Sequence, residues 1–273
     1  MGSRSRHLGA AVLCLAGLLA PAVADEAAER ALGTLWTLHQ RETTNGNHQA
    51  VIAACAEWER AQAGNPFLPV SRGLAGWHML KLGATGDASR TFATLAQPAA
   101  EGGVPGAART MAWRWLTRLD REQVRAALRE FYIHNVRYPD AIEELQKAKG
   151  GPLVRVTDRW GKPWRYRLAK FKRLQKMRDQ RYDLESAMLV GCSDVNQALA
   201  APYAGGIGLV PLEIAKGGDG KPAVVFQAGG QANKKAVLTE GTDYEGISLV
   251  YVGASLIILS DGDAWQVLPK PGC

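Results

Sequence analysis

The sequence predicts an α+β protein of several domains: an N-terminal array of helical hairpins, an α+β middle and a small all-β C-terminal domain. Three observations predict this class. Apolar residues recur at helical spacing through residues 25–119. A long amphipathic helix, a Tyr-Pro pair and a strand pattern follow in residues 120–200. Short β-rich runs between Gly, Asp and Asn turns fill residues 208–273.

Residues 1–24 have the order of basic, apolar and small residues that marks a signal peptide. Arg4 and Arg6 precede the run LGAAVLCLAGLLA, and AVA before Asp25 is a cleavage-site pattern. An uncleaved anchor is the alternative, although the run is short for a membrane span. Later segments lack the ~20 consecutive apolar residues of a membrane helix. We therefore expect an exported chain in the periplasm or cell envelope, with no membrane span after cleavage.

The cysteine count suggests one disulfide. Three cysteines follow the signal, and an odd number leaves at least one thiol without an intramolecular partner. Cys192 and Cys273 both lie in the C-terminal half, so we expect them to pair, although the sequence cannot supply the geometry that a disulfide needs. Cys55 is then the free thiol.

The chain is basic, and part of its charge is concentrated. The net charge of +7 falls to +5 when Arg4 and Arg6 are removed. Five basic residues after the predicted strand form a candidate contact surface: Lys170, Lys172, Arg173, Lys176 and Arg178. A solvated loop, an acidic protein partner and an anionic lipid surface are the alternatives. Export argues against nucleic acid except in DNA uptake.

The helical region consists of four amphipathic segments separated by Gly-containing breaks. Their apolar faces hold Val51, Cys55 and Trp58, then Val70, Leu74 and Trp77, then Ala88, Phe92 and Leu95, and last Met111 and Trp115. The stretch LGATGDASRTF resembles the join between the two helices of a tetratricopeptide repeat. That resemblance implies a partner-docking array, and a plain helical bundle is the alternative.

The middle segment combines a helix with rigid turn chemistry. The stretch DREQVRAALREFYIHN predicts a helix, and Pro139 stops it by restricting Tyr138 to an extended conformation. In the later stretch DRWGKPWRYRL, Asp158 can bond the backbone of a turn, and Gly161 permits a positive φ. Tryptophans and a tyrosine then follow to pack a strand onto the helix.

These stretches resemble the globular part of the major pseudopilin of type II secretion, protein G. The resemblance covers about residues 124–190. Matching positions are Tyr132, Tyr138, Pro139, Leu145, Asp158, Trp160, Gly161, Pro163, Trp164 and Tyr166, with Arg159 in place of the usual Pro. The resemblance implies a structural helix-to-sheet joint, and a place in a secretion or pilus apparatus.

Two departures from that family matter. The chain lacks the long apolar N-terminal helix that builds a filament, so we do not expect a major filament subunit. The family binds calcium through acidic residues in its last loop, and here that region offers only Asp194. Because a hard cation wants several oxygen ligands, we expect neither calcium nor another cofactor.

The last segment has a weaker resemblance to a periplasmic β-domain. That domain is shared by protein C of type II secretion and the type IV pilus lipoprotein P. Gly-acidic turns at Glu240-Gly241 and Glu245-Gly246 and the strand over residues 256–259 fit its pattern. Generic β-hairpins in a small barrel or sandwich are the alternative.

Catalytic and cofactor motifs are missing from the sequence. GASLI and GISLV lack the second Gly of a nucleophile elbow, GGDGKPA continues with Pro222 instead of Ser or Thr, and GGIGLVP fails a dinucleotide pattern at Pro211. The histidines that we inspected show no close pairing, so we expect no zinc site: His39, His48, His78 and His134.

Three functional hypotheses follow. The first is a non-enzymatic envelope component of a type II secretion or type IV pilus-like apparatus that acts through protein-binding surfaces. The second is an exported enzyme or enzyme accessory on a reused scaffold, which a pocket with a perturbed acid or base would favour. The third is a DNA-binding protein in uptake, which salt-dependent binding would reveal.

Overall fold

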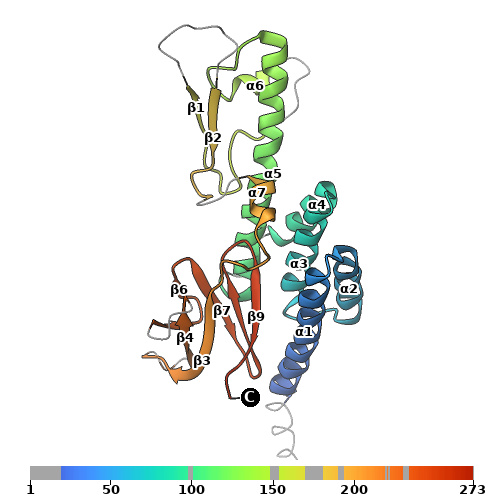
Figure 1. The fold of residues 1–273 in the computed structure, drawn as a ribbon, viewed down its shortest axis with the longest axis vertical. Helices are drawn as coiled ribbons and strands as arrows, with labels where there is room; N and C mark the ends of the chain where they lie inside the picture. The colour runs from blue at the N-terminus through green and yellow to red at the C-terminus, as the bar shows by residue number, and fades with distance from the viewer. Residues whose placement is uncertain are drawn as a thin grey trace, which may run out of the picture.

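The computed structural model describes residues 20–97, 101–147, 154–169, 181–189, 194–218, 220, 222–229 and 234–272. Helices and small antiparallel sheets make up this part of the chain, which confirms the α+β class (Figure 1). None of the described helices combines the length and the apolar character that a bilayer crossing requires.

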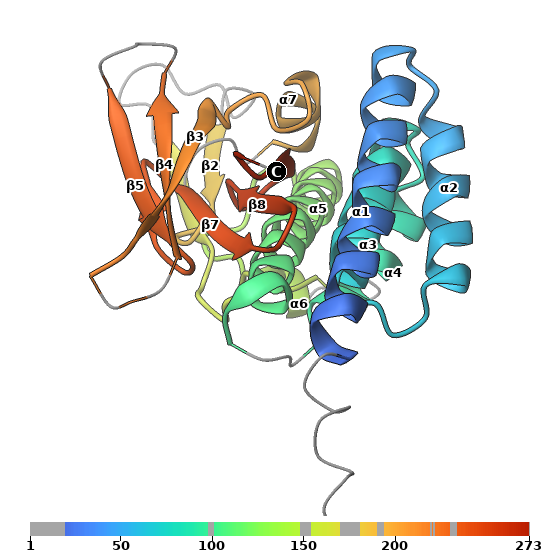
Figure 2. The same cartoon turned by 90° about the horizontal axis from the view of Figure 1, so that it is seen from below.

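Four helices pack side by side at the N-terminal end, joined by short turns (Figure 2). They are α1 (Ala20–Thr44), α2 (His48–Ala61), α3 (Leu68–Lys81) and α4 (Thr85–Leu95). Asn47 caps α2 by accepting a 3.3 Å hydrogen bond from the Ala50 amide. Gly46 and Gly83 take positive φ values where the chain reverses. The helical faces expected from the sequence are buried, except that Trp58 is only partly covered.

One long helix, α5 (Gly103–Asn135), is shared by two hydrophobic cores. Its first half buries Trp115 among the other helices, and its second half buries Leu128 in a separate cluster. The helix runs without a break across the boundary that we expected between residues 119 and 120, because neither Gly nor Pro interrupts it there. It ends where Val136 adopts a left-handed conformation with φ 54°.

Two antiparallel sheets form the C-terminal part, with strand orders β3-β4-β5 and β6-β7-β8-β9. The strands are β3 (Leu209–Lys216), β4 (Pro222–Ala228), β5 (Lys235–Thr239), β6 (Asp243–Tyr244), β7 (Ile247–Val252), β8 (Leu256–Ser260) and β9 (Trp265–Pro269). Phe226 and Leu259 lie in the core between the two sheets, whereas Ile258 and Trp265 pack against the helices. Outer sheet, inner sheet and helices therefore form successive layers (Figure 2).

A β-bulge in β7 lets one strand serve both cores. The register between β7 and β8 shifts between Leu249 and Tyr251. Leu249 faces the outer sheet, whereas Val250 and Tyr251 both lie with the helices. From that position the Tyr251 hydroxyl donates a 2.9 Å hydrogen bond to Glu29 on α1.

Glu29 is a polar link between α1 and the inner sheet. It is 1% exposed, and it also accepts hydrogen bonds from the amides of Ala254 and Ser255 at 2.9 and 2.7 Å. Burial alone would raise the pKa of Glu29, but the hydrogen bonds from Ser255, Ala254 and Tyr251 lower it. Gly253 is required beside this carboxylate, because a Cβ at that position would collide with it.

Two arginines of α5 hold the turn between β8 and β9. Arg114 and Arg118 each donate two hydrogen bonds to Asp263, at 2.6–2.8 Å. The Arg118 side chain is 1% exposed, and its guanidinium lies 4.7 Å from the ring centroid of Trp115. Burial would raise the pKa of Asp263, but hydrogen bonds from the two arginines lower it. The cluster joins the helical layer to the sheet.

Candidate functional site

The residues with the pseudopilin-like pattern form a lobe on the second half of α5 (Figure 1). We call the described residues of 120–189 the lobe, and the rest of the described chain the body. The lobe includes α6 (Glu144–Lys147), β1 (Arg165–Ala169) and β2 (Arg181–Glu185), with β1 and β2 antiparallel. Its core consists of Val124, Ala127, Leu128, Ile142, Leu145, Val154, Trp164 and Leu184.

Asp158 organises the turn that leads into β1. Its buried carboxylate accepts hydrogen bonds from the amides of Trp160 and Lys162, at 3.0 and 2.9 Å. It also accepts a 2.7 Å hydrogen bond from the Ser186 hydroxyl, which the sequence did not suggest. Gly161 takes φ 75° at the tip of the turn. One side chain thus fixes the turn and ties it to the segment after β2.

Aromatic residues join the Tyr-Pro corner to the strands. The Tyr166 hydroxyl donates a 2.8 Å hydrogen bond to the Pro139 carbonyl. The Tyr138 ring centroid lies 4.8 Å from those of both Tyr132 and Tyr182. Burial raises the pKa of Tyr138 and Tyr166, and neighbouring tyrosines add to the effect, so both phenols stay neutral.

The remaining predicted motif residues pack the turn onto α5. The Trp160 ring meets Trp113 of α5 edge to face, with centroids 5.7 Å apart. Trp164 is buried, and its indole N–H donates a 2.8 Å hydrogen bond to a backbone carbonyl. Pro163 forms an isolated antiparallel bridge with Thr157. All ten positions that matched the pattern therefore lie in the lobe.

Arg159, the departure from the family pattern, ties the lobe to the middle of α5. Its guanidinium donates two hydrogen bonds to Asp120, at 2.5 and 2.8 Å. Asp120 is 4% exposed, and the Arg159 amide also donates to the Thr117 hydroxyl at 3.3 Å. A proline in place of Arg159 could make neither contact.

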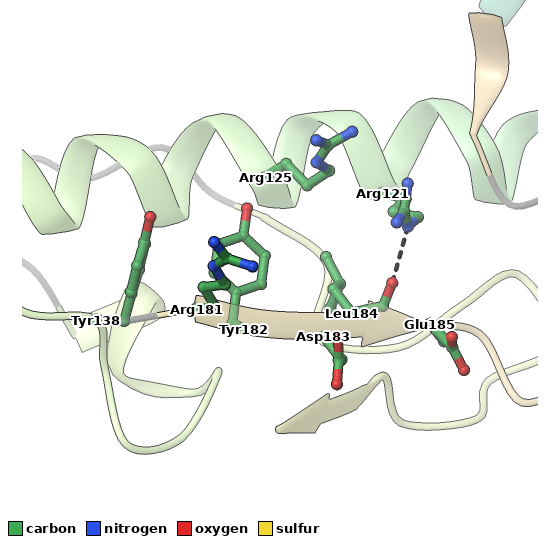
Figure 3. Close-up of a pocket in the computed structure, with 8 residues that line it drawn as sticks. All are labelled: Arg121, Arg125, Tyr138, Arg181, Tyr182, Asp183, Leu184 and Glu185. Atoms are coloured by element: carbon green, nitrogen blue, oxygen red, sulfur yellow. Dashed lines mark hydrogen bonds between the residues drawn. The ribbon is translucent and has the colours of Figure 1, made fainter. Parts of the chain in front are cut away.

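A cleft of about 360 Å³ lies between α5 and β2 (Figure 3). Its lining residues are Arg121, Arg125, Tyr138, Arg181, Tyr182, Asp183, Leu184 and Glu185. In Figure 3, Tyr182 reaches toward the helix, whereas Asp183 and Glu185 point away from it. Arg121 is held in place because its Nε donates a 2.8 Å hydrogen bond to the Leu184 carbonyl. The helix side of the cleft is thus basic, and the strand side contributes the aromatic Tyr182 and the basic Arg181.

The arginines of the cleft are only partly neutralised. Arg125 pairs with Glu122 at 3.1 Å and with Asp194 at 3.4 Å, and its side chain stays 36% exposed. Burial would lower the pKa of Arg125, but Glu122 and Tyr182 raise it. Guanidinium groups of this kind bind carboxylates by paired hydrogen bonds. The cleft can therefore receive an acidic group.

Asp194 has a structural role at the helix after the lobe. Its carboxylate caps α7 (Val195–Ala200) by accepting a 3.0 Å hydrogen bond from the Gln197 amide. That hydrogen bond is the main reason why its pKa is lowered. The acid that we compared with a calcium loop is thus engaged with α7 and Arg125.

Two of our expectations concern residues outside the described part of the chain. These are the disulfide between Cys192 and Cys273, and the basic surface of Lys170, Lys172, Arg173, Lys176 and Arg178. Cys55 is described and is a buried free thiol. Burial raises its pKa to about 12, which keeps it protonated.

The structure corrects our expectation that the histidines are unpaired. His39 Nδ1 lies 3.0 Å from His78 Nε2, and His48 Nδ1 lies 2.8 Å from His78 Nδ1. The Thr43 hydroxyl lies 3.2 Å from His39 Nδ1. Packing of α1, α2 and α3 brings together side chains that are 39 and 30 positions apart in the chain. His134, in contrast, is exposed and contacts the Glu130 carbonyl at the end of α5.

Two members of this histidine chain, His39 and His48, line a cavity of about 560 Å³ in the body. Helices α1 to α3 and the segment after α7 form its walls. The lining residues are Trp36, His39, Gln40, Thr43, Thr44, His48, Trp77, Lys81, Ala200, Ala201, Pro202, Tyr203, Ala204 and Gln266. The sequence offered one signal: His39 continues the buried helical stripe of Leu32, Leu35 and Trp36.

Comparison of the chain with protein-family models, with curated proteins and with solved structures found no match.

Proposed function

We propose that the protein is a non-enzymatic component of the cell envelope, in a type II secretion or type IV pilus-like apparatus, and that it acts by binding other proteins. The observation that carries the proposal is the lobe: a small unit with its own core, extended from the body on α5, with a basic and aromatic cleft. Such a unit is suited to binding a partner protein through its surface.

The same proposal gives each part of the chain a role. The helices α1 to α4 form a docking array of tetratricopeptide-like hairpins, and the lobe is a pseudopilin-like module. The C-terminal sheets form a small domain that can offer a strand edge to a partner. The signal-like residues 1–24 direct the chain to the periplasm or envelope.

The cleft favours an acidic segment of the partner. Arg121 and Arg125 come from successive turns of α5, and Arg181 comes from the start of β2. Three guanidinium groups around one depression attract carboxylates, and the ring of Tyr182 supplies apolar contact. Because the site is partly exposed, its attraction weakens as salt rises.

The proposal is tested by pull-down of envelope membrane extracts with the chain from Asp25 onward, followed by mass spectrometry. We expect secretion or pilus apparatus proteins to be recovered, and Arg121→Ala with Arg125→Ala to reduce their recovery about 10-fold or more. Arg90→Ala on α4 is the matched control, since this exposed arginine lies outside the cleft. Recovery of generic abundant proteins alone, or salt-dependent binding to DNA, would contradict the proposal.

The second candidate function is an exported enzyme, and the histidine chain is the observation that favours it. Burial, with smaller effects from neighbouring His48 and other charged groups, lowers the pKa of His39 to about 4 and of His78 to about 3. A general base works best with a pKa near the working pH. The two buried imidazoles are therefore weak bases at neutral pH, which makes this candidate second to the binding protein.

A further inference from the structure

The three histidines form a linear chain and not a set of metal ligands. His78 faces His39 through Nε2 and His48 through Nδ1, so the two contacts use different sides of one ring. A zinc ion needs nitrogen ligands about 2.0–2.1 Å from a single point. Within the described residues, no group of three or more His, Cys, Asp or Glu side chains has an arrangement that could hold a metal ion.

The hydrogen bonds between the three histidines couple their protonation states. A neutral imidazole has one N–H donor and one acceptor nitrogen. When His78 Nδ1–H donates to His48 Nδ1, the proton of His48 lies on Nε2. That nitrogen is on the side of the ring away from His78, and His48 lines the cavity. The tautomers of His39 and His78 thereby decide whether His48 Nε2 donates a hydrogen bond to a bound group or accepts one from it.

Lys81 supplies the positive charge of this cavity. Its Nζ donates a 3.0 Å hydrogen bond to the Leu199 carbonyl and lies 5.3 Å from the ring centroid of Trp77. An ammonium group has three donors, so these contacts hold Lys81 in place and leave N–H groups for a further acceptor. Among the described lining residues, Lys81 is the only Lys, Arg, Asp or Glu.

Unsatisfied polar atoms lie in the same walls. Trp36 Nε1 and Gln266 Oε1 are buried and have no hydrogen-bond partner among the described residues. Trp36 is 6% exposed. Neither atom is reached from the cavity, so the polar groups that can meet a guest are Lys81 Nζ and the outer nitrogen of His48. The volume of about 560 Å³ suits a small organic molecule.

We infer that this cavity binds a small organic carboxylate. Lys81 Nζ and His48 Nε2 hold the carboxylate. The rings of Trp36, Trp77 and Tyr203 form the apolar wall. This site lies in the body and is separate from the protein-binding cleft of the lobe.

The test is an NMR titration of the chain from Asp25 onward, observing imidazole and indole nitrogens. The probes are N-acetylglycine, which has a carboxylate and an amide N–H, its neutral analogue N-acetylglycinamide, citrate and inorganic phosphate. We expect N-acetylglycine to cause saturable shifts at His48 and Trp36 and to place the His48 proton on Nε2. The neutral analogue should bind at least about 10-fold more weakly, since it lacks the charge.

Lys81→Met should weaken carboxylate binding at least about 10-fold. Lys216→Met on β3 is the control, because this exposed lysine is remote from the cavity lining and should leave binding unchanged. Unfolding curves of both variants check that the fold is intact. The inference is overturned if neither carboxylate saturates, if the neutral analogue binds equally well, if phosphate alone binds, or if Lys81→Met has no effect.

Discussion

The two halves of α5 are embedded in opposite ways. In the first half even a charged residue is enclosed: Arg118 is 1% exposed and is paired with Asp263. The second half covers the lobe core on one face and leaves the other open, so that Ile133 is 69% exposed. The contrast teaches that one helix can be a core element at one end and a support for a projecting surface at the other.

The largest expected effect tests the enclosed half. Asp263→Ala leaves the buried Arg118 without its partner, and we expect it to lower the free energy of unfolding by about 3–5 kcal/mol. Chemical denaturation followed by tryptophan fluorescence measures the loss. Asp87→Ala on α4 removes an exposed pair with Arg90 and should cost about 0.5 kcal/mol or less. Equal losses for the two variants would contradict the contrast.

Acid should act on the body through its histidines. His39 has a folded pKa of about 4 because it is buried, with a further contribution from His48, against about 6.5 in an unfolded chain. Between these values the unfolded chain binds more protons, so stability falls as the pH falls from about 6.5 to 4. The loss from His39 alone is about 3 kcal/mol. The groups that line the same cavity as His39 include Lys81, which is a cation, and Tyr203, whose pKa is raised by burial.

Urea unfolding at a series of pH values measures this effect. The double variant His39→Gln, His78→Gln should show a flatter profile than the unchanged chain over that range. His134→Gln changes an exposed histidine of the lobe and should leave the profile as it is. Parallel profiles for the double variant and the unchanged protein would refute this role of the buried histidines.

The lobe should respond locally to Asp158→Ala. The variant removes the acceptor of three hydrogen bonds, and we expect a loss of about 2 kcal/mol. Hydrogen exchange should accelerate at Trp160, Lys162 and β2 and stay unchanged in α2 and α3. Asp183→Ala, an exposed change on β2, is the control. Faster exchange throughout the body would show that lobe and body unfold as one unit.

The smallest expected effect concerns the Tyr-Pro corner. Tyr166→Phe removes the hydrogen bond to the Pro139 carbonyl and keeps the ring, so we expect a loss of about 1 kcal/mol. Hydrogen exchange of the lobe measures it. Tyr244→Phe in the outer part of the C-terminal sheets is the comparison and should leave the lobe unaffected. A loss of lobe stability larger than that of Asp158→Ala would contradict the expected ranking of the two variants.

Local chemistry made part of this fold predictable. Gly161 acts on its own backbone, so the turn before β1 follows from the sequence, whereas α5 already ends at a left-handed Val136, three residues before Pro139. The helix and strand classes also follow from periodicity, because burial of one face imposes it. The domain boundary that we expected between residues 119 and 120 had no such local signal, and α5 runs through that position.

The histidine chain and the pairing of Arg118 with Asp263 could not be predicted, because their members are distant in the chain. His39 and His78 are 39 positions apart, and Arg118 and Asp263 are 145 apart. Such pairs depend on how helices and sheets pack, and neither motif spacing nor local propensity encodes that. The charge of the cleft was only partly predictable from the sequence, since Arg121 and Arg125 line a cleft only because β2 lies beside them.

The hydrogen bonds of Glu29 have a consequence for the order of folding. Its partners Tyr251, Ala254 and Ser255 are 222 to 226 positions later in the chain. Helix α1 therefore cannot complete its native contacts until the final hairpin has emerged, and such long-range closure slows folding. During synthesis the N-terminal helices therefore stay incompletely packed until the C-terminal strands have been made.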